Sequence, residues 1–356
     1  MKATWLAIED DFEDYILAGD IGGTNTNMAF VGHKNARFKT IASFVTSSGA
    51  ITNFPDIVSQ VLDEVTGHMP ERRPQFCCIC GAGPVRANAC KPTNLPWTID
   101  GDEIQQLFGL KTRVMNDFQA VCYGVPLLDI KDPQMVIPIP HPGGFKPEPS
   151  GGSWAIAGAG TGLGVGYLTR IGEKYHSIPS EGGHTGFSPF DGESEALYRY
   201  VAKKYNTTPG TELFLSGRGM SVIFNFFRDI RRQKMVGVLE EIQAASDQDK
   251  PPLITKHTPT NEVCKQIMRL FIRIYGNFAS RVALFFLPTA GMFIAGGIAI
   301  RHSARFLEGD LFIDAFENSY NPLMQSVLAN IPVYIVNDYS ISVRGAAHAA
   351  VTHMTD

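Results

Sequence analysis

The sequence predicts an α/β protein built from two domains. At 356 residues, 44% of them hydrophobic, the chain can bury a large core and exceeds the usual size of one domain. Residues 15–81 contain a strand, a glycine-rich turn, a second strand, an amphipathic helix and a third strand, which is an α/β order. A strand, a glycine turn and a strand recur over residues 154–168, so the same arrangement occurs once in each predicted domain.

The first predicted domain covers residues 1–127, with residues 337–356 returning to it. YILAG at 15–19 is an apolar run of strand length that stops at the turn DIGGTNTN. Residues 54–65 repeat apolar side chains at helical spacing. The other elements predicted here are a strand over FCCIC (76–80), a helix over 101–110, a strand over 112–116 and a closing helix over 341–353.

The second predicted domain covers residues 128–336. It opens with SWAIAGAGTGLGVGYLTR (153–170), which we interpret as a strand, a glycine turn and a strand. Residues 246–262 are polar and rich in proline, and therefore predict a linker. Helices are predicted over 193–204, 217–243 and about 261–287, and strands within GMFIAGGIAIR (291–301) and over IPVYIV (331–336).

Charge, hydropathy and cysteine usage restrict the partners and the compartment. The net charge is −4 and no basic stripe with interleaved aromatic residues is present, so nucleic acid is not an expected partner. The chain has no run of about 18 apolar residues and no secretory signal pattern, so we expect no membrane contact. Its six cysteines are unevenly spread, which suits reduced thiols and a cytoplasmic protein.

Three of these cysteines lie in FCCIC, where their close spacing raises the alternative of a zinc site. A structural zinc site normally takes four ligands, and no second Cys pair or Cys/His pair follows at a usable spacing. We therefore interpret FCCIC as a buried strand that ends in the turn GAGPV.

The stretch AGAGTGLGVG, residues 157–166, carries five glycines in an apolar context. A dinucleotide-binding fold requires G-x-G-x-x-G directly before a helix, but the strand-like VGYLTR follows here. A P-loop requires G-x-x-x-x-G-K-[ST], and no such string occurs in the chain. The remaining interpretation is that backbone N–H groups of this turn and of DIGGTNTN bind phosphate, although either turn alone is also typical of a plain tight hairpin.

Seven motifs follow one another along the chain: GDIGGTN (19–25), TNLPW (93–97), NDF (116–118), GAGTGLGVG (158–166), PSEGGH (179–184), ELFLSGRG (212–219) and FIAGGI (293–298). In order and spacing they resemble the bacterial-type glucokinase family of the actin-like ATPase and sugar kinase superfamily, from about residue 15 to the C-terminal region. The resemblance implies a two-domain actin-like ATPase (ribonuclease H-like) sugar kinase fold with a cleft between the domains.

The resemblance also implies a sugar site. Asp117 matches the family's catalytic base, which would accept the proton of the reacting hydroxyl, although Asp at the start of DFQAVCYG is also typical of a helix N-cap. Carboxylates accept strong hydrogen bonds from paired sugar hydroxyls. Alternatively, a histidine in a glycine turn can be structural, a glutamate can be solvated, and an asparagine can brace its loop. The implied sugar-binding residues are Asn94, Asn116, Asp117, Glu181, His184 and Glu212.

The nucleotide site implied by the resemblance uses ATP and Mg²⁺. Asp20, at the end of the first strand, suits a hydrated Mg²⁺ that neutralises phosphate charge. Asn27 stands near the turn where the family commonly has arginine or another residue, which bears on nucleotide affinity. The residues after His184 are TGFSPF, without the cysteines of the zinc-containing relatives. The implied nucleotide-binding residues are Gly19, Asp20, Ile21, Gly22, Gly23, Thr24, Gly160, Thr161, Gly162, Gly296 and Gly297.

The sequence therefore predicts an ATP-dependent glucokinase that converts glucose to glucose 6-phosphate. The resemblance suggests a homodimer with glucose and ATP as its small-molecule partners. Two alternatives remain open at this point: a non-catalytic sugar-sensing protein of the same fold, and a kinase for another hexose.

Overall fold

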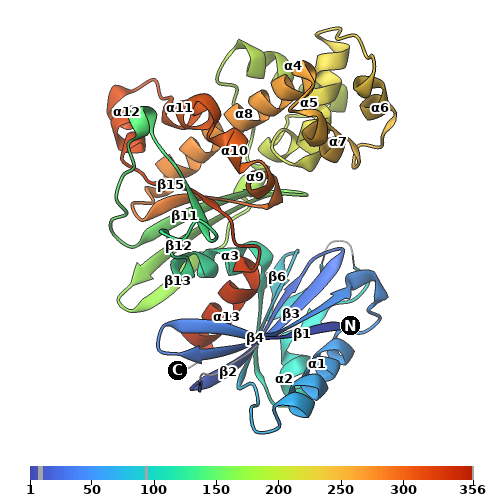
Figure 1. Cartoon of the computed structure of the whole chain (residues 1–356), viewed down its shortest axis with the longest axis vertical. Coiled ribbons are helices and arrows are strands. Elements are labelled where there is room, and N and C mark those ends of the chain that lie inside the picture. Colours follow the sequence, from blue (N-terminus) through green and yellow to red (C-terminus); the bar gives the residue numbers. More distant parts are fainter. Residues whose placement is uncertain (7–10, 93–94, 355–356) are drawn as a thin grey trace. The chain divides into compact units, whose positions relative to one another are not determined.

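The computed structural model describes residues 1–6, 11–92 and 95–354. The chain forms two compact units, which are described separately (Figure 1). Unit 1 comprises Met1–Asp129, Arg170–Ile178 and Asp338–Asp356, and unit 2 comprises Ile130–Thr169 and Pro179–Asn337. The sequence predicts residues 128–336 as one domain, whereas the segment Arg170–Ile178 belongs to unit 1 in the structure.

Unit 1 is built on a mixed sheet with strand order β1-β4-β3-β2-β5-β9. β2, β3 and β4 are antiparallel neighbours, whereas β5 and β9 run parallel to β2. All six residues of β5 are buried, which confirms the predicted strand over the cysteine-rich run. The strands are β1 (Lys2–Trp5), β2 (Asp14–Ile21), β3 (Asn25–Lys34), β4 (Arg37–Ser47), β5 (Phe76–Gly81) and β9 (Lys111–Asn116), with β6 (Val85–Arg86), β7 (Ala89–Cys90) and β8 (Ile99–Asp100) in a small second sheet and β13 (Lys174–Ile178) in the inserted segment.

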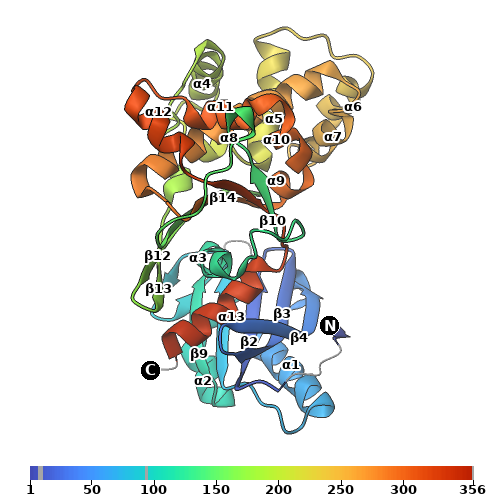
Figure 2. The same ribbon diagram turned by 60° about the vertical axis from the view of Figure 1, so that its left-hand side comes forward.

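Helices pack on this sheet, as Figure 2 shows for α13. α1 (Phe54–His68) and α2 (Gly101–Phe108) contribute apolar residues to one core with the strands. α13 (Ile341–Met354) contacts β2, β5 and α3 (Asp117–Gly124), so the C-terminal segment does return to unit 1. The close approach of α13 to α3 depends on Gly345, where a Cβ atom would lie 1.8 Å from Ala120 O.

Unit 2 contributes the strands β10-β15-β14-β11-β12, in that order, to a second mixed sheet. β11, β14 and β15 are parallel, and antiparallel β10 and β12 flank them. β11 and β12 form the predicted strand–turn–strand hairpin. The strands are β10 (Val136–Ile139), β11 (Ser153–Ala159), β12 (Leu163–Ile171), β14 (Gly291–Ala295) and β15 (Val333–Val336).

Helices of unit 2 bury a large apolar core around α8 (Glu262–Phe286), which contacts β11, β14, α5 and α11. Asn261 caps α8 by accepting hydrogen bonds from Val263 N–H and Cys264 N–H at 3.0 and 3.1 Å. Within the described ranges, no helix combines the length and apolar character needed to cross a bilayer. The other helices are α4 (Gly192–Tyr205), α5 (Gly217–Asp229), α6 (Val238–Ala244), α7 (Lys250–His257), α9 (Gly297–Arg301), α10 (Ser303–Phe306), α11 (Leu311–Glu317) and α12 (Pro322–Ala329).

The expectation of a linker over residues 246–262 is wrong in part, because α7 (Lys250–His257) lies within it. Its two prolines fall in the first turn of the helix, where a missing backbone N–H costs no helical hydrogen bond. Ile254 is fully buried and anchors the helix in the core of unit 2. The helices predicted over 217–243 are α5 and α6 in the structure.

We predict that Gly345→Ala lowers the free energy of unfolding by about 2–3 kcal/mol, because the added methyl group would overlap the backbone of α3. Gly67 in α1 is the matched control, since a Cβ atom there has no neighbour within 4 Å. Gly67→Ala should stabilise the protein by about 0.5–1 kcal/mol through helix propensity. Urea unfolding followed by circular dichroism measures both, and equal effects of the two variants would contradict the packing argument.

Candidate active site

The glycine-rich turn of unit 1 joins the antiparallel strands β2 and β3. Gly22 N–H donates to Asn25 O at 2.9 Å, which closes the turn. Ser48 braces it, because its Oγ donates to Gly22 O at 2.6 Å and its N–H to Thr24 O at 2.9 Å. Gly23 and Thr24 are exposed. The turn is therefore held in place from one side while its tip offers backbone groups to a ligand, as phosphate binding requires.

Asp20 lies one residue before the end of β2, opposite Cys80 of β5. Ser342 Oγ donates to Asp20 Oδ2 at 2.6 Å, and Cys80 Sγ lies 3.7 Å from Asp20 Oδ1. Burial raises the pKa of the Asp20 carboxyl, and the hydrogen bonds from Ser342 and Cys80 act against that rise. The half-buried carboxylate is thus held in one orientation beside the turn.

A single carboxylate of this kind fits Mg²⁺, which is usually bound by one or two carboxylates, with water and substrate phosphate as its other ligands. In the part of the chain that the structure describes, no group of three or more His, Cys, Asp and Glu side chains could hold a metal ion. Asp20 could hold Mg²⁺ directly or through water.

Asn116 and Asp117 lie where β9 passes into α3. Asn116 is the N-cap of α3: its Oδ1 accepts from Phe118 N–H at 2.9 Å, and its Nδ2 donates to Gly83 O at 3.3 Å. Asp117 is the first helical residue and accepts from Phe118 N–H through Oδ1 at 2.8 Å. The alternative that Asp117 is the N-cap is wrong, because Asn116 has that role. Both side chains are half-buried.

The register of the parallel strands brings these residues to one edge of the sheet. Ile21 pairs with Gly81, and Gly81 with Asn116, so the ends of β2, β5 and β9 coincide. The carboxylates of Asp20 and Asp117 both lie close enough to Cys80 to add to the effect of burial, which raises the pKa of this thiol well above its usual value. Two carboxylates and a glycine turn therefore share one edge of unit 1.

In unit 2, Gly160, Thr161 and Gly162 form the turn between β11 and β12. Gly160 N–H donates to Gly162 O at 2.9 Å, and Gly217 N–H, at the start of α5, donates to Gly160 O at 2.8 Å. Thr161 is exposed. A Cβ atom on Gly160 would have no neighbour within 4 Å, which leaves room for a ligand to approach the backbone.

Glu212 connects this turn to the segment that follows α4. Its Oε2 accepts from Leu163 N–H, the first residue of β12, at 3.1 Å. A Cβ atom on Gly162 would lie 2.8 Å from the same oxygen, so glycine is needed there for the carboxylate to reach the turn. Glu212 is half-buried and structurally bound, which is not the environment of a solvated helix residue.

Glu181 and His184 flank the short 3₁₀ turn Gly182–His184. His184 Nε2 lies 3.9 Å from Glu181 Oε2, and both side chains are mostly exposed, by 63% and 82%. Gly183 is buried and packs so closely on β12 that a Cβ atom there would lie 1.9 Å from Leu163 O. The glycine pair therefore lets the turn pack against β12 while Glu181 and His184 point into solvent.

Backbone hydrogen bonds join this 3₁₀ turn to the segment that carries Glu212. Thr211 donates to Thr185 O through its N–H at 2.8 Å and through its Oγ1 at 3.0 Å. The structure thus brings Glu181, His184 and Glu212 into one region of unit 2, next to the turn at 160–162.

Gly296 and Gly297 follow β14 and begin α9. Gly296 has φ of 93°, and a Cβ atom on it would lie 2.5 Å from Ala159 O. Only glycine fits that conformation and that distance. The AGG turn therefore lies directly beside the turn at 160–162, with which it shares an edge of the sheet through the parallel pairing of β11 and β14.

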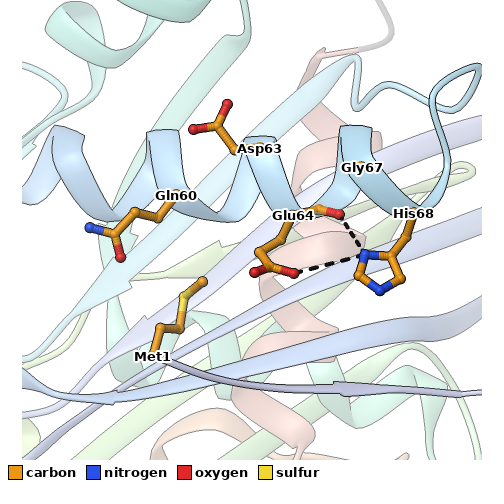
Figure 3. A pocket seen from close by; sticks show the side chains of 6 residues that line it. All are labelled: Met1, Gln60, Asp63, Glu64, Gly67 and His68. Atoms are coloured by element: carbon orange, nitrogen blue, oxygen red, sulfur yellow. Dashed lines mark hydrogen bonds and ion pairs between the residues drawn. The ribbon is translucent and has the colours of Figure 1, made fainter.

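Asn94, the remaining predicted sugar ligand, lies outside the described residues. A pocket of unit 1 beside α1 contains none of the predicted residues (Figure 3). Its His68 donates from Nδ1 to Glu64 O at 3.0 Å, and the same nitrogen lies 3.8 Å from Glu64 Oε2. The pocket is lined by Met1, Gln60, Asp63, Glu64, Gly67 and His68.

The sequence analysis does not predict three supporting residues: Ser48, Ser342, and Tyr275, whose hydroxyl accepts from Ala159 N–H at 3.0 Å next to the turn at 160–162. Ser48 and Ser342 are isolated serines without a motif, so the sequence holds no signal for them. Tyr275 lies in the apolar face of a long helix, where the sequence pattern predicts only a core residue.

Comparison with known proteins identifies the relatives of this chain. A family model described as Glucokinase matches residues 17–353. The glucokinase of Nostoc sp. is 32% identical over 348 residues, which cover 94% of this chain and 98% of the relative.

Solved structures agree with this match. A glucokinase from an Antarctic psychrotroph has a TM-score of 0.79 at 26% identity and covers 95% of this chain and 98% of its own. A ROK family glucokinase from Streptomyces griseus, solved with glucose and AMPPNP, has a TM-score of 0.59 at 18% identity, covering 94% and 99%. The predicted actin-like ATPase sugar kinase fold is confirmed by these neighbours.

We predict that Glu212→Ala lowers the free energy of unfolding by about 1–3 kcal/mol, because Leu163 N–H loses its acceptor in a half-buried site. Glu181→Ala is the matched control and should change it by less than about 0.5 kcal/mol, since Glu181 is exposed. Urea denaturation measures both. Similar small effects would show that the Glu212 carboxylate does not hold the turn.

Proposed function

The chain belongs to the glucokinase family, and we propose that it transfers the γ-phosphoryl group of ATP to the 6-hydroxyl of glucose. The same structural feature in both units supports the assignment of the active-site residues. Each unit has a glycine turn at the carboxyl ends of parallel strands, with carboxylates directly beside it. Glycine turns bind phosphate through backbone N–H groups, and carboxylates bind sugar hydroxyls.

In this proposal Asp117 is the catalytic base. Its carboxylate accepts the proton of the 6-hydroxyl as that oxygen attacks the γ-phosphorus of ATP, and the bond between phosphorus and the ADP oxygen breaks. Position N1 of α3 supports this role, because the positive end of the helix dipole stabilises the ionised carboxylate before the proton arrives. The hydrogen bond from Phe118 N–H to Oδ1 fixes its orientation.

In this proposal, side chains that accept or donate hydrogen bonds bind the hydroxyl groups of the sugar. Glu181, His184 and Glu212 would bind hydroxyls from unit 2, and Asn116 has a second Nδ2 hydrogen besides the one donated to Gly83 O. Asn94 completes the set by resemblance. A site of this kind rejects analogues that lack a hydroxyl, because polar groups that the bound ligand covers would be left without a partner.

The nucleotide is held mainly by backbone. The turn at Gly22–Thr24 and the turn at Gly160–Gly162 would bind phosphate oxygens, and the backbone at Gly296 and Gly297, beside the second turn, would adjoin the adenosine. AMPPNP in the Streptomyces griseus structure supports ATP as the donor. Mg²⁺ at Asp20, when bound, neutralises phosphate charge during transfer.

Assembly and location belong to the same proposal. We propose a homodimer on the family resemblance alone.

The six cysteines form no disulfide, and burial raises the pKa of the Cys78 and Cys122 thiols to about 12, which keeps them protonated and unreactive. This chemistry suits a reducing compartment such as the cytoplasm.

The activity is tested by coupled assay of the purified full chain with ATP and Mg²⁺ against glucose, mannose, fructose and N-acetylglucosamine. We expect ADP to form with glucose and kcat/KM to be highest for it. A preference for another hexose would replace glucose in the proposal. If no sugar supports ADP formation, the chain is instead a sugar-binding protein of this fold.

We predict that Asp117→Asn lowers kcat by about 10²–10⁴-fold, because the amide keeps the oxygen acceptor for Phe118 N–H but cannot take a proton. Nucleotide affinity should stay near the wild-type value. Asp56→Asn, in the first turn of α1, is a matched control that should leave kcat unchanged. Steady-state kinetics and nucleotide titration measure the three proteins, and near-wild-type turnover of Asp117→Asn would exclude it as the base.

A further inference from the structure

The hydroxyl group of Tyr275 lies at the ends of two parallel strands. Tyr275 belongs to α8 and is completely buried. Its hydroxyl oxygen accepts a hydrogen bond from Ala159 N–H at 3.0 Å. The same hydroxyl lies 3.0 Å from Ala157 O and 3.2 Å from Ala295 O, so its one hydrogen is shared between a carbonyl of β11 and a carbonyl of β14.

These contacts fall where the chain leaves the sheet. Gly158 and Ala295 are the last paired residues of β11 and β14. Ala159 directly precedes the turn at Gly160, and Ala295 directly precedes Gly296. The hydroxyl therefore binds backbone groups at the ends of both strands, close to the start of the two glycine turns.

Packing fixes the position of this hydroxyl. The ring of Tyr275 meets Phe271, Phe306 and Phe312 edge-on, with centroid separations of 6.2, 5.7 and 6.1 Å. Burial raises the pKa of the Tyr275 hydroxyl, so it stays protonated and remains a donor. A rigid aromatic ring in a packed core thus holds one polar atom against the two strand ends.

The distance between the turn at Gly160 and the turn at Gly296 depends on the position of the Tyr275 hydroxyl. A Cβ atom on Gly296 would already lie 2.5 Å from Ala159 O, so the turns are in close contact. Small shifts of either strand end would change where Gly160 and Gly296 present their backbone groups. Binding sites tolerate such shifts poorly, since a displacement of about 1 Å is enough to lose much of the binding or catalytic effect.

We propose that Tyr275 is a positioning residue for the nucleotide: through Ala159 and Ala295 it sets the distance between the turn at Gly160–Gly162 and the turn at Gly296–Gly297. The inference rests on the proposed function, in which the first turn binds phosphate and the second adjoins the adenosine. Tyr275 does not touch the nucleotide, so its effect is on ATP binding and not on the proton transfer at Asp117.

The test compares Tyr275→Phe with Phe312→Leu in the full chain. Tyr275→Phe keeps the ring and removes only the hydroxyl, whereas Phe312→Leu weakens the same core without removing a polar group. For Tyr275→Phe we expect KM for ATP to rise about tenfold, with KM for glucose within about twofold of wild type. For Phe312→Leu we expect a lower Tm with both KM values within about twofold.

An unchanged KM for ATP in folded Tyr275→Phe would overturn the proposal, and so would an equal rise of both KM values. Failure of the proposed function looks different, because the wild-type chain would then form no ADP with any sugar.

Hydrogen exchange on the wild-type chain keeps the test independent of how the variants fold. AMPPNP should protect peptides covering residues 157–163 and 293–299 together. Protection of one peptide alone, or of neither, would overturn the coupling between the two turns.

Discussion

The parallel pairing of β11 with β14 is the constraint on which the candidate site of unit 2 depends. Parallel neighbours end at the same edge, so the pairing of Gly158 with Ala295 forces the two following turns together. Gly296 then needs φ of 93° and no side chain, because Ala159 O occupies that space. Strand ends also leave backbone groups beyond the ladder, and buried groups of this kind need partners. Gly217 N–H and the Tyr275 hydroxyl supply them.

In unit 1 parallel strands also end together at one edge of the sheet, and the carboxylates of Asp20 and Asp117 lie at this edge. Burial opposes ionisation of Asp20, and a low-dielectric site between two carboxylates would oppose it further. Each carboxylate is therefore paired with a helix N-terminus. Asp117 is the first residue of α3, and Asp20 accepts from Ser342 in the first turn of α13. Helix N-termini stabilise nearby negative charge by about 0.3–1 kcal/mol, which favours the ionised form of a carboxylate and so acts against the effect of burial.

Most of the elements and the family could be predicted from the sequence, because both depend on local patterns. Alternating apolar runs and glycine turns predict the hairpins at 20–27 and 157–166, and the motif order predicts the family. Long-range contacts have no such local signal. The bond from Ser342 to Asp20 joins residues 322 positions apart, and the bond from Tyr275 to Ala157 spans 118. The helix at 250–257 was not predicted because prolines usually indicate a loop. They are compatible with a helix here only because they lie in its first turn.

The polar groups of unit 2 differ in how firmly they are held, and the difference follows from what each one binds. Glu181 and His184 are exposed side chains on a turn fixed by Gly183, so water competes for them until a ligand excludes it. Glu212 is bound through Oε2 to Leu163 N–H, and a carboxylate has a second oxygen that can accept a hydroxyl. Because Leu163 directly follows the glycine turn, a sugar on Glu212 and a phosphate at Gly160–Gly162 would share one rigid support. In the proposed function, that support places donor and acceptor, with the Glu212 side chain fixed by the hydrogen bond from Leu163 N–H.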